Sequence, residues 1–251
     1  MAHSRSPRAT VFTPAGRKRT ALVPPVADMP IYSQVGEAIK DAIFSGRLKP
    51  GDPLRELHLA AELSVSQGSV REALVQLQNS GMVVRIPNKE TIVTKLSSDE
   101  VRERLMMREA LEALAWPVAA KRMGPQDYAE LERRSDAISA AVDADNYSGL
   151  AIADLEFHRY IWASSQHPTL CLTLEQITAP LFAFVSCIHS RNRDRLSNTL
   201  NSHEEVIRAL RSGRVRAIHR ALREHLSGSY DAFLNSGHKD FQDWYAASDD
   251  S

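Results

Sequence analysis

Residues 56–94 read ELHLAAELSVSQGSVREALVQLQNSGMVVRIPNKETIVT, and this stretch decides the fold of the first part of the chain. Residues 56–63 predict a short helix with apolar residues on one face. A tight link follows, in which Ser66 is an N-cap residue. A further helix is predicted at about residues 67–80, and Gly81 ends it as a glycine just past a helix commonly does.

One more helix precedes this stretch and a hairpin ends it. Apolar residues at helical spacing begin after Pro30 and stop at Gly46. Residues 82–86 and 91–94 are β-prone runs on either side of a polar tip, which predicts a hairpin. Helix, helix, turn, helix and hairpin is the order of a winged helix-turn-helix, which we place at residues 30–96. In such a domain the helix after the turn enters the major groove of DNA.

Polar side chains that can read DNA lie at the start of this recognition helix and on the hairpin. Glutamine can form a bidentate pair with adenine, and arginine with guanine, while a serine at a helix start can bind a phosphate. The expected DNA-contacting residues are Ser66, Gln67, Ser69, Arg71, Arg85 and Lys89. Spacing alone leaves an alternative, because many tri-helical units bind no DNA and Arg71 can instead pair with Glu62 or Glu72.

Charge is distributed unevenly along a chain whose formal net charge is zero. Residues 1–95 hold 13 Lys and Arg against 8 Asp and Glu, whereas residues 96–251 hold 18 against 23. A net positive charge in the N-terminal part favours binding to nucleic acid, whose backbone carries phosphates. Residues 1–29 are basic and rich in proline, so we expect a disordered tail that either adds non-specific DNA affinity or has no role. The sequence shows no membrane span and no signal peptide, and we expect a cytoplasmic protein.

Beyond a short polar linker at residues 97–100 the sequence shows helical signals and no strand signal. Helices are predicted at about 99–123, 125–143, 147–165, 168–190, 195–211 and 214–235. Short breaks between amphipathic helices indicate an antiparallel helical bundle, which we place at residues 101–236. A polar tail is expected at 237–251. The predicted fold class is therefore mainly α, with a winged helix-turn-helix followed by an all-α bundle.

Four side chains of the bundle could bind a metal ion together. Asp154 and His158 are four residues apart, so they share one face of a helix. His203 and His225 lie on two further helices. Imidazole suits zinc, nickel and iron, and a mixed nitrogen and oxygen set also suits manganese. The chain has nine histidines, so scattered surface histidines are the alternative interpretation.

The first domain resembles the DNA-binding domain of GntR-type regulators over residues 32–96. Three motifs carry this resemblance: G-x-L-x-P-G at Gly46–Gly51, L-x-E-x-x-L-A at Leu54–Ala60, and V-x-x-x-x-V-R-E-A-L at Val65–Leu74. The resemblance implies DNA binding and a DNA-contact role for Arg71. The chain departs from the family at Gln67, where arginine is usual, and at Lys89-Glu90, where the wing tip usually has glycine. These departures predict an altered operator half-site.

The bundle resembles, more loosely, the FCD ligand-binding domain of the FadR subfamily of GntR regulators. The matching motifs are Arg108–Glu112, Asp154–His158, His203–Leu210 and Ala221–Leu226. Metal-binding members of the family use one Asp and three His at these places. The resemblance therefore implies a divalent metal site, with zinc as the first choice, formed by Asp154, His158, His203 and His225.

The sequence and the resemblance together predict a regulator and not an enzyme. We expect a homodimer that represses a palindromic operator and responds to a small carboxylate or sugar acid held at the metal. Arg108 is the expected second contact for this acid, because guanidinium binds carboxylate in bidentate fashion. Its alternative is an ion pair with Glu112 at the bundle edge. The competing functions are a metal-free regulator that senses an apolar effector and a metallohydrolase, although no H-E-x-x-H motif occurs.

Overall fold

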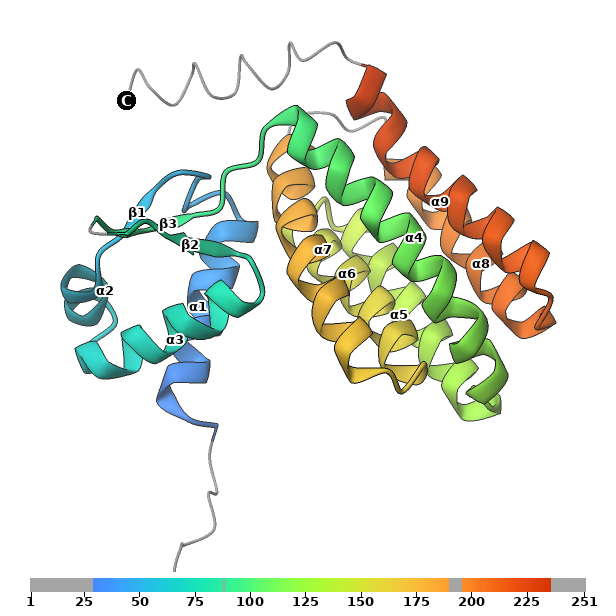
Figure 1. The fold of residues 1–251 in the computed structure, drawn as a ribbon, viewed down its shortest axis with the longest axis horizontal. Helices are drawn as coiled ribbons and strands as arrows, with labels where there is room; N and C mark the ends of the chain where they lie inside the picture. Colours follow the sequence, from blue (N-terminus) through green and yellow to red (C-terminus); the bar gives the residue numbers. More distant parts are fainter. Residues whose placement is uncertain (1–28, 88, 190–195, 236–251) are drawn as a thin grey trace, which may run out of the picture.

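The computed structural model describes residues 29–87, 89–189 and 196–235, with the backbone alone for 185–189, 196–201 and 229–235. A small winged unit and a helical bundle make up this part of the chain, and α4 leads from one into the other (Figure 1). The predicted mainly α fold class is confirmed. The tails expected at 1–29 and 237–251 lie outside the described residues, apart from Met29.

The winged unit contains three helices and three short strands. In chain order they are α1 (Ile31–Phe44), β1 (Pro53–Leu54), α2 (Glu56–Glu62), α3 (Gln67–Asn79), β2 (Val83–Arg85) and β3 (Thr91–Val93). Strands β2 and β3 are the predicted hairpin, and β1 joins them as a third antiparallel strand in the order β1-β3-β2. Strand β1 was not predicted from the sequence. It is two residues long, and it begins with a proline, which is tolerated because β1 lies at the edge of the sheet.

Local signals in the sequence account for both ends of the recognition helix α3. The Ser66 hydroxyl accepts a hydrogen bond from the backbone N–H of Ser69 at 3.1 Å, as predicted for an N-cap residue. At the other end Gly81 has φ +74°, the left-handed conformation that favours glycine. Between these ends Val70, Leu74 and Leu77 are buried against α1.

The bundle contains the six predicted helices, each ending within one residue of its expected bounds. They are α4 (Ser98–Arg122), α5 (Pro125–Asp143), α6 (Tyr147–Ser164), α7 (Pro168–His189), α8 (Leu196–Ser212) and α9 (Val215–Asn235). Ser97 and Glu100 form a capping box at the start of α4, so most of the linker expected at 97–100 is the first turn of this helix. Within the described ranges no helix is long and apolar enough to span a membrane.

The winged unit contacts the bundle through α1, which packs on α6 and α7, and through the turn after α3. Pro180 lies inside α7 and has no N–H, so the carbonyl of Gln176 lacks its usual helical donor. Arg104 of α4 donates to this carbonyl at 3.2 Å. Gly81 packs against the same carbonyl, close enough that a Cβ at Gly81 would lie 2.5 Å from the oxygen. The end of the recognition helix therefore rests directly on a bundle helix.

We expect Gly81→Ala to destabilise the chain more than Gly213→Ala does. Both glycines have positive φ, where an alanine costs about 1–2 kcal/mol. A Cβ at Gly213 would meet nothing within 4 Å, whereas at Gly81 it would collide with Gln176. The collision should add about 1–3 kcal/mol to the loss in the free energy of unfolding, which denaturant titration measures. Equal losses for the two variants would show that the contact with α7 contributes nothing to stability.

Candidate functional site

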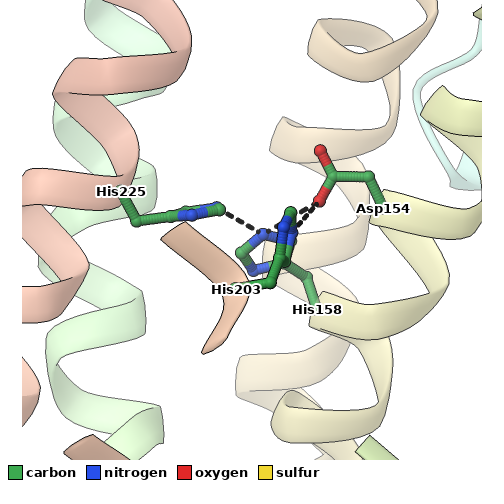
Figure 2. A group of neighbouring side chains, drawn as sticks. All are labelled: Asp154, His158, His203 and His225. Atoms are coloured by element: carbon green, nitrogen blue, oxygen red, sulfur yellow. Dashed lines mark hydrogen bonds and ion pairs between the residues drawn. The ribbon is translucent and has the colours of Figure 1, made fainter. Parts of the chain in front are cut away.

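The four residues expected to bind a metal lie together inside the bundle. Asp154 and His158 extend from α6, His203 from α8 and His225 from α9 toward a common centre (Figure 2). One ligand atom from each residue lies within 4.8 Å of all the others. The three imidazoles are buried, and Asp154 is largely so. This arrangement excludes the alternative of scattered surface histidines for these three residues.

Two hydrogen bonds and an ion-pair contact connect the four side chains, which we call the Asp-His cluster (Figure 2). The Nε2 atom of His203 lies 2.9 Å from Oδ1 of Asp154. The Nε2 atom of His158 lies 3.0 Å from Nε2 of His225 and 3.4 Å from the same Oδ1. All three imidazoles therefore direct Nε2 into the cluster, and buried polar groups of this kind need such partners.

The surroundings keep two members of the cluster in the forms that bind metals. Burial raises the pKa of Asp154, but the interactions with His203 and His158 outweigh it and hold the pKa well below its usual value. Burial, together with the neighbouring His203 and His158, lowers the pKa of His225 well below that of a free imidazole. Asp154 is therefore an anion and His225 a neutral imidazole with a lone pair available.

Further side chains lie next to two of the imidazoles, and one of them forms a hydrogen bond. Nδ1 of His225 lies 3.0 Å from the Ser202 hydroxyl, within hydrogen-bond distance, whereas Nδ1 of His158 lies 3.3 Å from Oε1 of Glu112 without hydrogen-bond geometry. A hydrogen-bond partner such as Ser202 fixes the ring orientation and tautomer of a histidine that binds a metal. Burial raises the pKa of Glu112, but Arg108 and His158 outweigh it, so this pKa lies below the ordinary value and Glu112 is ionised.

Arg108 lies against the Asp-His cluster with 1% of its surface exposed. Its Nε atom is 3.3 Å from Oε1 of Glu112, which is the ion pair given as the alternative from the sequence, although it forms in the interior and not at the edge. Its Nη2 atom also lies 3.0 Å from Nε2 of His158. Because a guanidinium only donates, this Nε2 is the acceptor in the contact. Burial and Arg108 lower the pKa of His158, but Glu112 and Asp154 outweigh them and raise it above its usual value. The guanidinium carbon also lies 4.9 Å from the ring centre of Phe182.

The expected DNA-contacting residues lie on the winged unit, but four of them, Ser66, Gln67, Ser69 and Arg71, are engaged within it. The hydroxyls of Ser66 and Ser69 bond each other at 2.9 Å. Arg71 pairs with an acid, as in its alternative interpretation, but this acid is Glu56 of α2 and not Glu62 or Glu72. Gln67, Arg85 and Lys89 line an open groove of about 740 Å³ between α2 and the wing.

Sequence reasoning missed the roles of Glu56 and Ser202. Glu56 belongs to the family motif at Leu54–Ala60. Its contacts with Gln67 and Arg71 of α3 join residues 11 and 15 positions apart, which local spacing in the sequence does not reveal. Ser202 directly precedes His203, yet it contacts the imidazole of the next helix. Both contacts depend on how helices pack against each other.

Two family profiles match the two parts of this architecture. Residues 31–93 match the profile described as bacterial regulatory proteins of the gntR family, and residues 103–228 match the FCD domain. The chain belongs to the GntR family, in the branch with an FCD domain. The resemblance inferred from the sequence motifs is therefore confirmed for both domains of this regulator.

Relatives of this GntR regulator share most of its length. A probable D-xylose utilization operon transcriptional repressor of Paenarthrobacter nicotinovorans is 28% identical over 82% of this chain and 90% of its own. The HTH-type transcriptional repressor RspR of Escherichia coli is 23% identical over 86% and 94%. Among solved structures, E. coli McbR/YncC shares the fold with a TM-score of 0.72 at 23% identity, covering 86% of this chain and all of that one.

Proposed function

We propose that this GntR regulator is a repressor whose affinity for its operator is controlled by a small organic acid bound beside a divalent cation. The observation that carries the proposal is the buried Asp-His cluster in contact with the Arg108 guanidinium, inside the domain attached to a winged helix-turn-helix. Repression is supported by two relatives that are named as repressors. Such a protein acts on DNA in the bacterial cytoplasm.

The donor set of the cluster fits a divalent metal ion. Asp154 offers a carboxylate oxygen, and His158, His203 and His225 each offer Nε2 from the bundle interior. Zinc suits this set best, and nickel, manganese and iron also accept mixed nitrogen and oxygen ligands. Such an ion would supply a fixed positive charge to which an acid can bind. The hydrogen bond between Ser202 and Nδ1 of His225 supports this arrangement, because it leaves Nε2 of His225 facing the cluster.

The charges around the cluster favour an acid as the effector. Asp154 and Glu112 are negative and Arg108 is positive, so a divalent cation leaves this buried group one positive charge in excess. Buried charge without compensation is costly, and a carboxylate that contacts both the cation and Arg108 would neutralise it. The indole N–H of Trp116, whose ring stacks on His158, has no hydrogen-bond partner within the described residues. It offers a donor to a hydroxyl of a sugar acid.

A symmetric dimer is the form in which we expect this repressor to bind a palindromic operator. Large apolar side chains on the bundle surface support a contact with a second copy, since Met106 and Leu114 of α4 are 73% and 64% exposed. Helix α7 supports communication between the two domains. It places Phe182 against Arg108 and Gln176 against Gly81, so a shift of α7 on acid binding would move the recognition helix.

Operator binding measured with and without metal tests the proposal. The operator is first selected from random duplexes with the wild-type protein, and zinc-loaded and chelator-treated proteins are then titrated with sugar acids and dicarboxylates. At least one acid should weaken operator binding of the zinc-loaded protein by about 5- to 150-fold, the usual range of allosteric coupling. The chelated protein and zinc-loaded Arg108→Lys, which keeps the charge but loses the bidentate group, should respond far less. An equal response without metal would support the metal-free regulator instead.

A further inference from the structure

The carboxylate of Glu56, at the start of α2, binds two of the side chains expected to read DNA bases. Arg71 of α3 donates to it from Nε at 3.1 Å and from Nη2 at 2.8 Å. Gln67 donates from its amide nitrogen at 2.9 Å. Both donors reach the same oxygen, Oε2, so one atom of α2 holds two side chains of the recognition helix.

The contact with Glu56 leaves the base-reading end of Arg71 available. The carboxylate occupies the Nε and Nη2 side of the guanidinium, and the Nη1 atom takes no part in this contact. Guanine is recognised through O6 and N7 by the end of the guanidinium that carries Nη1 and Nη2. Arg71 is 58% exposed, so it can keep its partner on one side and meet a base with the other. An arginine held in this way loses less conformational freedom on binding than a free one.

The same carboxylate sets the orientation of the Gln67 amide. Only the NH₂ group of a glutamine can donate to a carboxylate, so the side-chain nitrogen must face Glu56 and the oxygen must face away. One N–H and the oxygen then remain, which are the donor and acceptor that adenine requires. Glu56 therefore fixes which base pattern Gln67 presents to the groove.

Glu56 also changes the electrostatics of the surface that meets DNA. Hydrogen bonding by Arg71 lowers the pKa of Glu56 in spite of partial burial, with Gln67 and the charges of Arg71 and Arg85 adding to this effect. Glu56 is thus an anion that offsets the charge of Arg71. Non-specific binding depends on uncompensated positive charge facing phosphates, so this anion weakens it.

We propose that Glu56 is a specificity-determining positioning residue that orients Arg71 and Gln67 toward bases and restrains binding to non-operator DNA. This inference rests on the proposed function, because it assumes that α3 reads an operator. A purely local role is the alternative, since an acid in the first turn of α2 also stabilises the helix through its dipole. The two roles differ in what they do to sequence discrimination.

The test compares Glu56→Gln with Glu62→Gln, which removes the same charge from the same helix. Affinities for the selected operator and for a scrambled duplex are measured at several salt concentrations, after thermal unfolding has shown that both variants are folded. Glu56→Gln should bind the operator about 10-fold more weakly and the scrambled duplex a few-fold more tightly, so its specificity ratio falls more than 10-fold. Glu62→Gln should keep the ratio of the wild type.

A double-variant cycle separates orientation from charge. In an Arg71→Ala background, Glu56→Gln should reduce the specificity ratio far less than it does in the wild type. The inference would be overturned if the two substitutions changed the specificity ratio independently of each other. It would also be overturned if Glu56→Gln changed this ratio no more than Glu62→Gln does. A wild-type protein that does not distinguish any selected duplex from the scrambled one would instead refute the proposed function. The two failures are therefore distinguishable.

Discussion

Replacing His203 with alanine is expected to weaken zinc binding by at least about 100-fold. Loss of a partner that only orients a metal ligand typically costs 10- to 100-fold in metal affinity, and loss of a ligand should cost no less. His203 is fully buried and lies 2.9 Å from Asp154, so its removal also takes away one of the two imidazoles that contact that carboxylate. Competition with a chromogenic chelator measures the affinity of the folded variant.

His167→Ala is the matched control for this experiment, because His167 is an exposed histidine in the same bundle. This control should bind zinc as tightly as the wild type does. The affinity of the wild type should also fall as the pH falls, because imidazole must lose its proton to bind a metal. Equal affinities of the His203→Ala variant and the wild type would contradict a metal site at the Asp-His cluster.

Arg71→Ala is expected to weaken operator binding by about 5- to 150-fold, the equivalent of 1–3 kcal/mol for a bidentate contact with a base. Its binding to a scrambled duplex should change much less, because Arg71 already has Glu56 as a counter-ion. The variant should therefore discriminate less between the operator and other DNA than the wild type does. Fluorescence anisotropy with both duplexes measures this difference.

Arg133→Ala is the control for charge, since it removes one exposed arginine from α5 of the bundle. It should leave both affinities close to those of the wild type. If Arg71→Ala weakened binding to both duplexes by the same factor, Arg71 would be a phosphate contact, and its proposed role in reading bases would be wrong.

The sequence predicts the helices of this chain well because their ends depend on local chemistry. Ser66 and Gly81 mark the two ends of α3, and the capping box of Ser97 and Glu100 marks the start of α4. Strand β1 escaped prediction because two residues cannot show a period. It forms only because β3 offers it a partner.

The candidate site was predictable only in part, because its contacts join distant segments. The spacing of Asp154 and His158 shows that they share a helix face. The bundle pattern leaves their convergence with His203 and His225 as one of two interpretations, and the family resemblance favours it. The spacing of Arg108 and Glu112 indicates their ion pair as an alternative to acid binding, whereas nothing local indicates that Arg108 also contacts His158, 50 residues away. Local patterns thus identify the candidate residues of the site, whereas the packing of the helices determines which side chains each of them contacts.

The affinity of the effector acid in the presence and absence of operator DNA tests the central claim most directly. Coupling between two binding sites is reciprocal, so the operator must weaken acid binding by the factor by which the acid weakens operator binding. Isothermal titration of an effective acid into the zinc-loaded chain, alone and saturated with operator, measures both affinities. We expect the chain to bind the acid about 5- to 150-fold more weakly in the operator complex than alone. The same affinity in both states would contradict acid control of DNA binding.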